Sequence, residues 1–188
     1  MRLTIQAGLI SMACLLLASF TVVAEEPAKG AMPAQGQVIN DAFREDQKIE
    51  ARAIDLIYEK FKVFIHVNVT SFNRNVLISG EVPDEATSTA IEKIVSGIEG
   101  VRSLNNELLV SENSSLSSRS NDSWITTNVK LRFARDKRIS TDRIRVVTEK
   151  GTVFLMGNIS RNEGDAAADI ASTTNRVVRV VKLFEYTD

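Results

Sequence analysis

The stretch "NDSWITTNVKLRFARDKR" combines the only tryptophan of the chain with five Lys and Arg residues. An α-helix turns about 100° per residue, so Ile125, Val129 and Phe133 would share one apolar face. Trp124 and Leu131 fall on another face, roughly 150° away. Tryptophan beside cations suits either the surface of an anionic membrane or a contact between domains. The candidate lipid-binding residues are Trp124, Asn128, Lys130, Leu131, Arg132, Arg135, Lys137 and Arg138.

The residue types give little support to other chemistry. The chain has one Cys and one His, which excludes an internal disulfide and leaves no Cys-His or Ser-His-Asp set suited to nucleophilic catalysis. A zinc site of the usual kind needs several Cys or His ligands. His66 alternates with Asn68 on an expected strand and is predicted to face solvent or to form a hydrogen bond. We therefore expect no catalytic residues, no metal site and no cofactor, in a protein that is not an enzyme.

Residues 1–24 have the pattern of a secretory signal peptide. An apolar stretch from Leu9 to Val23 is followed by a polar segment, as expected before a cleavage site. This stretch is short for a transmembrane helix. Cleavage after Ala24 predicts an exported protein, and the alternative is a lipoprotein anchored through Cys14. Residues 25–40 are rich in Ala, Pro, Gly and Gln and are predicted to form a flexible lead.

The rest of the chain consists of two related halves. "VNVTSFNRNVLISGEV" at 67–82 aligns without a gap on "IRVVTEKGTVFLMGNI" at 144–159. Each half has the pattern helix, strand, strand, helix, strand. The Ser-rich stretch 112–120 is expected to link domains at 41–111 and 121–188. A three-stranded mixed sheet with two helices on one face would bury one core per half, so the expected fold class is α+β.

The strand motifs of both halves resemble the BON domain family. The motif Val-x-Leu/Ile-x-Gly-x-Val/Ile occupies Val76–Val82 and Val153–Ile159, and an Ala-rich helical stretch follows it in each half. The resemblance covers residues 45–188 and implies two tandem BON domains, each αββαβ. It also implies a periplasmic protein at the outer membrane, associated with phospholipid binding and envelope stress. Arg176 departs from the pattern, because the family has a glycine there, as at Gly100.

Charge is divided unequally between the halves. Residues 41–118 hold 8 Lys and Arg against 13 Asp and Glu, a net charge of −5. Residues 119–188 hold 13 against 9, a net charge of +4. Either the halves dock through these charges, or the second half meets an anionic partner. The two explanations are compatible.

The first helix of the first half is an internal control for the tryptophan stretch. It keeps the core positions, but Lys48, Asp55 and Glu59 occupy the outward-facing ones. The fold therefore does not require Trp and Leu there. Three or four cations near an anionic surface contribute about 1 kcal/mol each, and burial of Trp and Leu adds on the order of 2–4 kcal/mol. After the costs of association we expect reversible binding to phosphatidylglycerol or cardiolipin, about micromolar at best.

A second apolar surface is expected on the sheet of the second half. Alternate residues there point away from the side that the helices would cover, namely Phe154, Met156, Val181 and Leu183. A bare apolar face is seldom left in water. Either the first domain covers it or another envelope protein does. The latter would suit a periplasmic stress or chaperone-like protein that acts through protein–protein contacts.

Overall fold

The computed structural model describes residues 35–61, 65–112 and 115–188, with side chains of the first helix described from residue 41. The expected signal peptide and Cys14 lie outside the described residues. Each half folds as αββαβ, with one 3₁₀ turn added in the second. The elements are α1 Gln35–Phe61, β1 His66–Phe72, β2 Asn75–Val82, α2 Glu85–Ser96, β3 Ser103–Val110, α3 Leu116–Arg135, η1 Thr141–Arg143, β4 Ile144–Glu149, β5 Thr152–Ile159, α4 Arg161–Ser172 and β6 Arg179–Tyr186.

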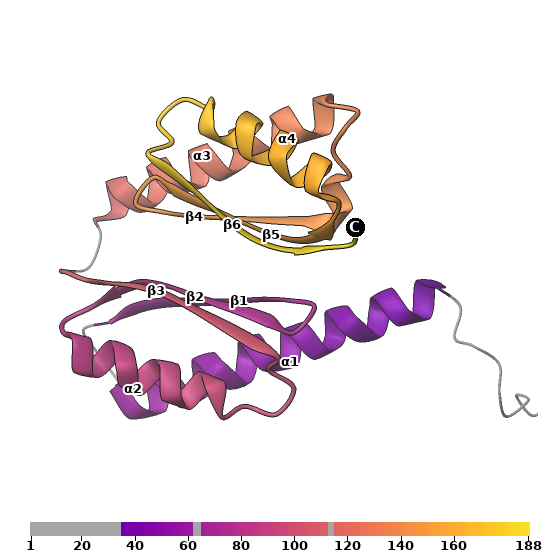
Figure 1. Cartoon of the computed structure of the whole chain (residues 1–188). Coiled ribbons are helices and arrows are strands. Elements are labelled where there is room, and N and C mark those ends of the chain that lie inside the picture. Colours follow the sequence, from indigo (N-terminus) through magenta and orange to yellow (C-terminus); the bar gives the residue numbers. More distant parts are fainter. Residues whose placement is uncertain (1–34, 62–64, 113–114) are drawn as a thin grey trace, which may run out of the picture. The chain divides into compact units, whose positions relative to one another are not determined.

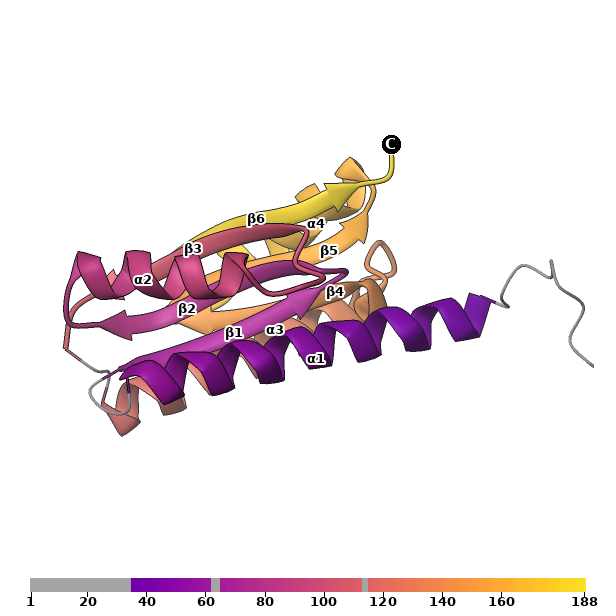
Figure 2. The same cartoon turned by 90° about the horizontal axis from the view of Figure 1, so that it is seen from below.

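Both sheets have the same mixed topology. Strand order is β1-β2-β3 in one and β4-β5-β6 in the other. The first two strands of each sheet are antiparallel, and the last strand is parallel to the middle one. Two helices cover one face of each sheet (Figure 1), and α1 and α2 cross the same face of the first sheet (Figure 2). The predicted fold class is confirmed.

One apolar core lies between the helices and the sheet of each half. In the second half, Ile125, Val129 and Phe133 of α3 are at most 1% exposed and pack with Val153 and Leu155 of β5. The first half repeats this arrangement with Ile49, Ala53 and Ile57 of α1 against β2. The helical spacing of four residues therefore places these side chains as the sequence predicts.

Two helices begin earlier than the sequence pattern predicts. Helix α1 starts at Gln35, within the predicted lead, and no Gly or Pro interrupts the chain between Gln37 and Gly80. Helix α3 starts at Leu116, within the predicted linker, because the Ser115 hydroxyl accepts a hydrogen bond from the Ser118 amide as an N-cap. Serine is a favourable cap although it is a poor helix former.

The glycines of the repeated motif allow close approach of two strands. A β-carbon at Gly80 would overlap the carbonyl oxygen of His66 on β1, and one at Gly157 would lie 2.6 Å from the carbonyl oxygen of Arg143. Gly80 also has a φ of +122°, which favours glycine. The backbone of β1 therefore excludes a side chain at Gly80, and the backbone of η1, just before β4, excludes one at Gly157.

A buried aspartate on the first helix of each half holds the β-hairpin turn. The Asp46 carboxylate accepts hydrogen bonds from the amides of Asn73 and Arg74, at 2.8 and 2.7 Å. In the second half, Asp122 accepts them from Lys150 and Gly151, at 2.9 and 2.8 Å. The sequence pattern did not predict this role. In both halves an Asp lies three residues before the first core Ile, and this repeated position could have indicated the shared role.

The helix-free faces of the two sheets contact one another. Leu77 of the first half forms one buried cluster with Phe154 and Met156 of the second, which are 2% and 0% exposed. Val181 and Leu183 are half-buried against this cluster. In the described part of the chain, no helix is long and apolar enough to cross a bilayer.

Candidate phospholipid-binding surface

The outward side of α3 carries apolar side chains that the core does not use. Trp124 is 40% exposed and Leu131 is 50% exposed. Lys130 and Arg135 of α3 are exposed as well, and so is Lys137, just after the helix ends. Within the described residues, the side chains of these three cations make no ion pair or hydrogen bond. The arrangement therefore joins an apolar stripe to cations that are available to an anion. We call these five residues the α3 stripe.

Arg132 and Asn128, two of the other predicted residues, make local contacts. The Arg132 guanidinium donates to the Ile170 carbonyl at 2.7 Å and to the hydroxyls of Thr173 and Thr174. Arg132 thus satisfies groups at the C-terminal end of α4, where a cation is favourable. The Asn128 amide donates to the Trp124 carbonyl at 2.8 Å, within the helix. Both residues hold the surface together and have less freedom to meet a ligand.

Arg138 is paired with Asp136 at the end of α3. Two guanidinium nitrogens donate to the carboxylate at 3.0 and 2.7 Å. This contact holds the pKa of Asp136 down at about 2, so the carboxylate is ionised at neutral pH. The charge of Arg138 is therefore largely compensated, whereas those of the α3 stripe are not.

Arg176 joins the surface, although sequence reasoning did not include it. Its guanidinium lies over the Trp124 ring, 4.6 Å from the centroid, and donates to the Asn121 side chain at 3.0 Å. Its φ of +67° is the left-handed conformation that favours glycine. The absence of the family's glycine at this position was the sequence feature that could have identified Arg176. A cation above the indole holds the ring in place and adds positive charge beside it.

The corresponding surface of α1 has a different chemistry. Lys48, Asp55 and Glu59 are exposed there, and Lys48 forms an ion pair with Glu45 at 2.7 Å. The two helices keep the same core contacts and differ on their outward sides. The α3 stripe is therefore a property of the second half alone.

Ion pairs between the halves neutralise some of their opposite charges. Three cations of the second half pair with acids of the first: Arg145 with Glu50 at 3.2 Å, Lys150 with Glu81 at 3.3 Å and Arg179 with Glu107 at 3.2 Å. Arg102 and Glu185 pair in the opposite direction. Pairs between exposed side chains contribute little each, and only the Lys150 pair has a fully buried partner, but together the pairs favour one way of docking. None of these contacts uses a cation of the α3 stripe.

Comparison with known proteins decides the family. A BON domain model matches residues 37–112 and again residues 121–188. The chain belongs to the BON domain family. Its two matched regions cover most of the two αββαβ units described above, so the predicted tandem arrangement is confirmed.

Three curated relatives are similar to this BON-domain chain. "Outer membrane lipoprotein DolP" of Haemophilus influenzae is 41% identical over 122 residues, 65% of this chain and 63% of that protein. "21 kDa hemolysin" of Actinobacillus pleuropneumoniae is 34% identical over 120 residues, 64% of this chain and 62% of that protein. "Osmotically-inducible protein Y" of Escherichia coli is 25% identical over 174 residues, 87% of each protein. The chain thus spans less than two thirds of the first two relatives. The expected envelope location agrees with the first relative's name.

Proposed function

We propose that this BON-domain envelope protein binds anionic phospholipid peripherally through α3 of its second domain. The observation that supports the proposal most is the α3 stripe, in which Trp124 and Leu131 remain exposed beside three cations that have no partner among the described residues. The equivalent side of α1 has acidic and paired residues instead. The role is one of binding, and it would support outer-membrane integrity and tolerance of stress.

The expected strength of binding follows from the residues of the surface. Three cations at an anionic surface contribute about 1 kcal/mol each, and burial of half-exposed Trp and Leu side chains adds on the order of 2 kcal/mol. Association costs several kcal/mol. The gross gain of about 5 kcal/mol corresponds to a dissociation constant of about 0.2 mM at best, so binding is weak, reversible and reduced by salt. Such affinity suits a periplasmic protein that meets the inner face of the outer membrane transiently.

Vesicle binding tests the proposal with a matched pair of variants. Trp124→Glu replaces an aromatic residue that is 40% exposed on α3, and Tyr58→Glu replaces one that is 38% exposed on α1. Both variants are expected to fold, because both side chains lie outside the cores. Vesicles of phosphatidylglycerol or cardiolipin in phosphatidylcholine should retain the wild type and Tyr58→Glu, but not Trp124→Glu. Equal retention of a folded Trp124→Glu variant would refute the proposal.

The surface expected for a chaperone-like role is not available in this structure. Phe154 and Met156 are buried against Leu77 of the first half. A partner that used them would first have to separate the halves. The lipid proposal needs no such rearrangement, because the α3 stripe is already exposed.

A further inference from the structure

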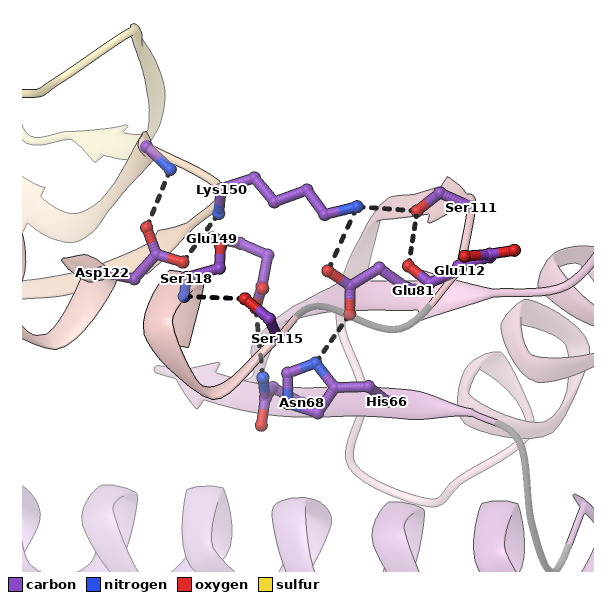
Figure 3. A network of polar contacts seen from close by, with 11 residues as sticks. His66, Asn68, Glu81, Ser111, Glu112, Ser115, Ser118, Asp122, Glu149 and Lys150 are labelled. Atoms are coloured by element: carbon purple, nitrogen blue, oxygen red, sulfur yellow. Dashed lines mark hydrogen bonds and ion pairs between the residues drawn. The ribbon is translucent and has the colours of Figure 1, made fainter. Parts of the chain in front are cut away.

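A buried polar network lies where the two halves meet, and it brings together three groups that can bind a metal ion (Figure 3). His66 and Glu81 face each other across β1 and β2, as partners in the antiparallel register. Glu149 is the last residue of β4 in the second half. One ligand atom from each of these side chains lies within 4.8 Å of the other two. Their positions in the sequence give no sign of this cluster, which the tertiary structure assembles.

The two carboxylates of the cluster are buried. The Glu81 side chain is 0% exposed, and Glu149 is 5% exposed. Burial, and then the negative charge of Glu81, raises the pKa of the Glu149 carboxyl. The nearby charge of Asp122 acts in the same direction. A site that holds two carboxylates together away from water favours a positive charge between them.

The hydrogen bonds already orient these groups around a common point. His66 Nδ1 lies 2.8 Å from Glu81 Oε2, whereas Lys150 Nζ lies 3.3 Å from the other oxygen, Oε1. Asn68 donates to Glu149 Oε2 at 3.2 Å. An ion on the imidazole side of Glu81 would therefore leave Lys150 in contact with the same carboxylate. Lys150 and Asn68 would then act as neighbours that fix the ligand carboxylates in position.

The distances suit a small ion with tetrahedral coordination. Zinc binds imidazole nitrogen and carboxylate oxygen at about 2.0–2.2 Å, which separates neighbouring ligand atoms by roughly 3.3 Å. The observed separations, 2.8 Å for one pair and no more than 4.8 Å for the set, lie on either side of that value. Small side-chain rotations would bring all three atoms to one ion.

A cavity of about 390 Å³ gives access to the cluster. His66, Asn68 and Glu149 line it together with Thr126 and Thr148. The cavity has polar walls and room for a water molecule as the fourth ligand, since a water needs only about 30 Å³. An ion could therefore enter without unfolding of either half.

We propose that His66 Nδ1 and the carboxylates of Glu81 and Glu149 bind one divalent transition-metal ion, with zinc as the representative ion, and that this ion joins the two BON domains. Two ligands come from the first domain and one from the second, so the bound ion would oppose their separation. Imidazole with two carboxylates suits zinc better than magnesium or calcium, which prefer oxygen ligands alone. The proposal is independent of lipid binding, because α3 supplies none of the ligands.

Thermal unfolding of the full chain, with EDTA or with zinc and without vesicles, tests this site. His66→Asn keeps a donor toward Glu81 but removes the imidazole ligand, and Glu149→Gln keeps an acceptor for Asn68. Glu107→Gln is the matched control, because it breaks a carboxylate contact between the halves at Arg179 but touches none of the ligands. At a zinc concentration one hundred times the dissociation constant, the unfolding midpoint of the wild type should rise by roughly 5–10 °C.

The variants, and magnesium as a second cation, show whether the rise in the unfolding midpoint comes from the proposed site. Glu107→Gln should keep the zinc-dependent rise, and the other two variants should lose most of it. Calorimetry should give one zinc ion per chain. The midpoint of each variant in EDTA shows whether it is folded, and if His66→Asn does not fold, Glu149→Gln decides the test. No rise in the wild type, an equal rise in Glu149→Gln, or an equal rise with magnesium at the same concentration would overturn the proposal.

Discussion

Replacement of Arg176 by glycine should separate the stability of the second domain from its affinity for lipid. Arg176 has a left-handed φ of +67°, which costs an arginine about 1–2 kcal/mol relative to glycine. Glycine relieves that cost, but it makes the unfolded chain more flexible, which destabilises the folded state by about 0.4–1 kcal/mol. The cation–π contact with Trp124, worth about 0.5–1 kcal/mol at an exposed site, is also lost. These contributions nearly cancel, so the unfolding midpoint should change by less than about 3 °C.

Lipid binding should respond differently to the same substitution. One cation near an anionic surface contributes about 1 kcal/mol, which corresponds to roughly a fivefold change in affinity. Arg176→Gly should therefore bind phosphatidylglycerol vesicles about fivefold more weakly at low salt. The difference should shrink at high salt, because the surface charges are then screened. Arg176→Lys keeps the charge and should remain within about twofold of the wild type.

The natural fluorescence of the protein provides the assay. Trp124 is the only tryptophan, so its emission reports directly on the stripe as vesicles are added. The emission of the free protein should also change in Arg176→Gly, because the guanidinium no longer covers the ring. Unchanged vesicle affinity in Arg176→Gly would refute the reasoning that places Arg176 at the lipid surface. A midpoint lowered by more than about 10 °C would refute the stability argument.

Two further predictions concern the β2 glycine of the motif and the end of α3. Gly80→Ala should cost more than about 3 kcal/mol or prevent folding, because its β-carbon would overlap the His66 carbonyl. Gly97→Ala is the control, with its nearest heavy atoms 3.5 Å from the new carbon, and equal chemical denaturation curves for both would contradict the clash. Asp136→Asn leaves Arg138 uncompensated and should strengthen vesicle binding about fivefold at low salt. Because the pKa of Asp136 is lowered from 3.8 to about 2, the ion pair persists above the ordinary pKa and is lost only as pH falls toward 2. Wild-type binding should therefore show no step from this pair between about pH 5 and 8, and weaker binding by Asp136→Asn in vesicle titrations would exclude the compensation.

Much of each domain could be predicted because the pattern is local. The spacing of Ile125, Val129 and Phe133 fixes the buried side of α3, and the alternation in β5 fixes its two faces. The start of α3 was missed because serine is a poor helix former but a good cap. The turn-capping roles of Asp46 and Asp122 were missed because their partners lie more than twenty residues away.

The unequal charge of the two halves is a feature whose consequences the sequence predicts only in part. Counts of charged residues predict attraction between the halves, but they do not assign partners. The structure pairs Lys150 and Arg179 with acids of the first half and leaves Lys130 and Arg135 exposed without side-chain partners among the described residues. Lys130 and Arg135 therefore remain available to an anion, whereas Lys150 and Arg179 do not.

The sequence by itself determined the tandem αββαβ fold, the core positions and the two-sided character of α3, because each depends on residues a few positions apart. The tertiary structure alone decided which cations are already engaged, that Arg176 stacks on Trp124, and that His66, Glu81 and Glu149 converge. These contacts join residues 15 to more than 80 positions apart. No periodicity links such residues, so they meet only when strand register and the docking of the two domains are fixed.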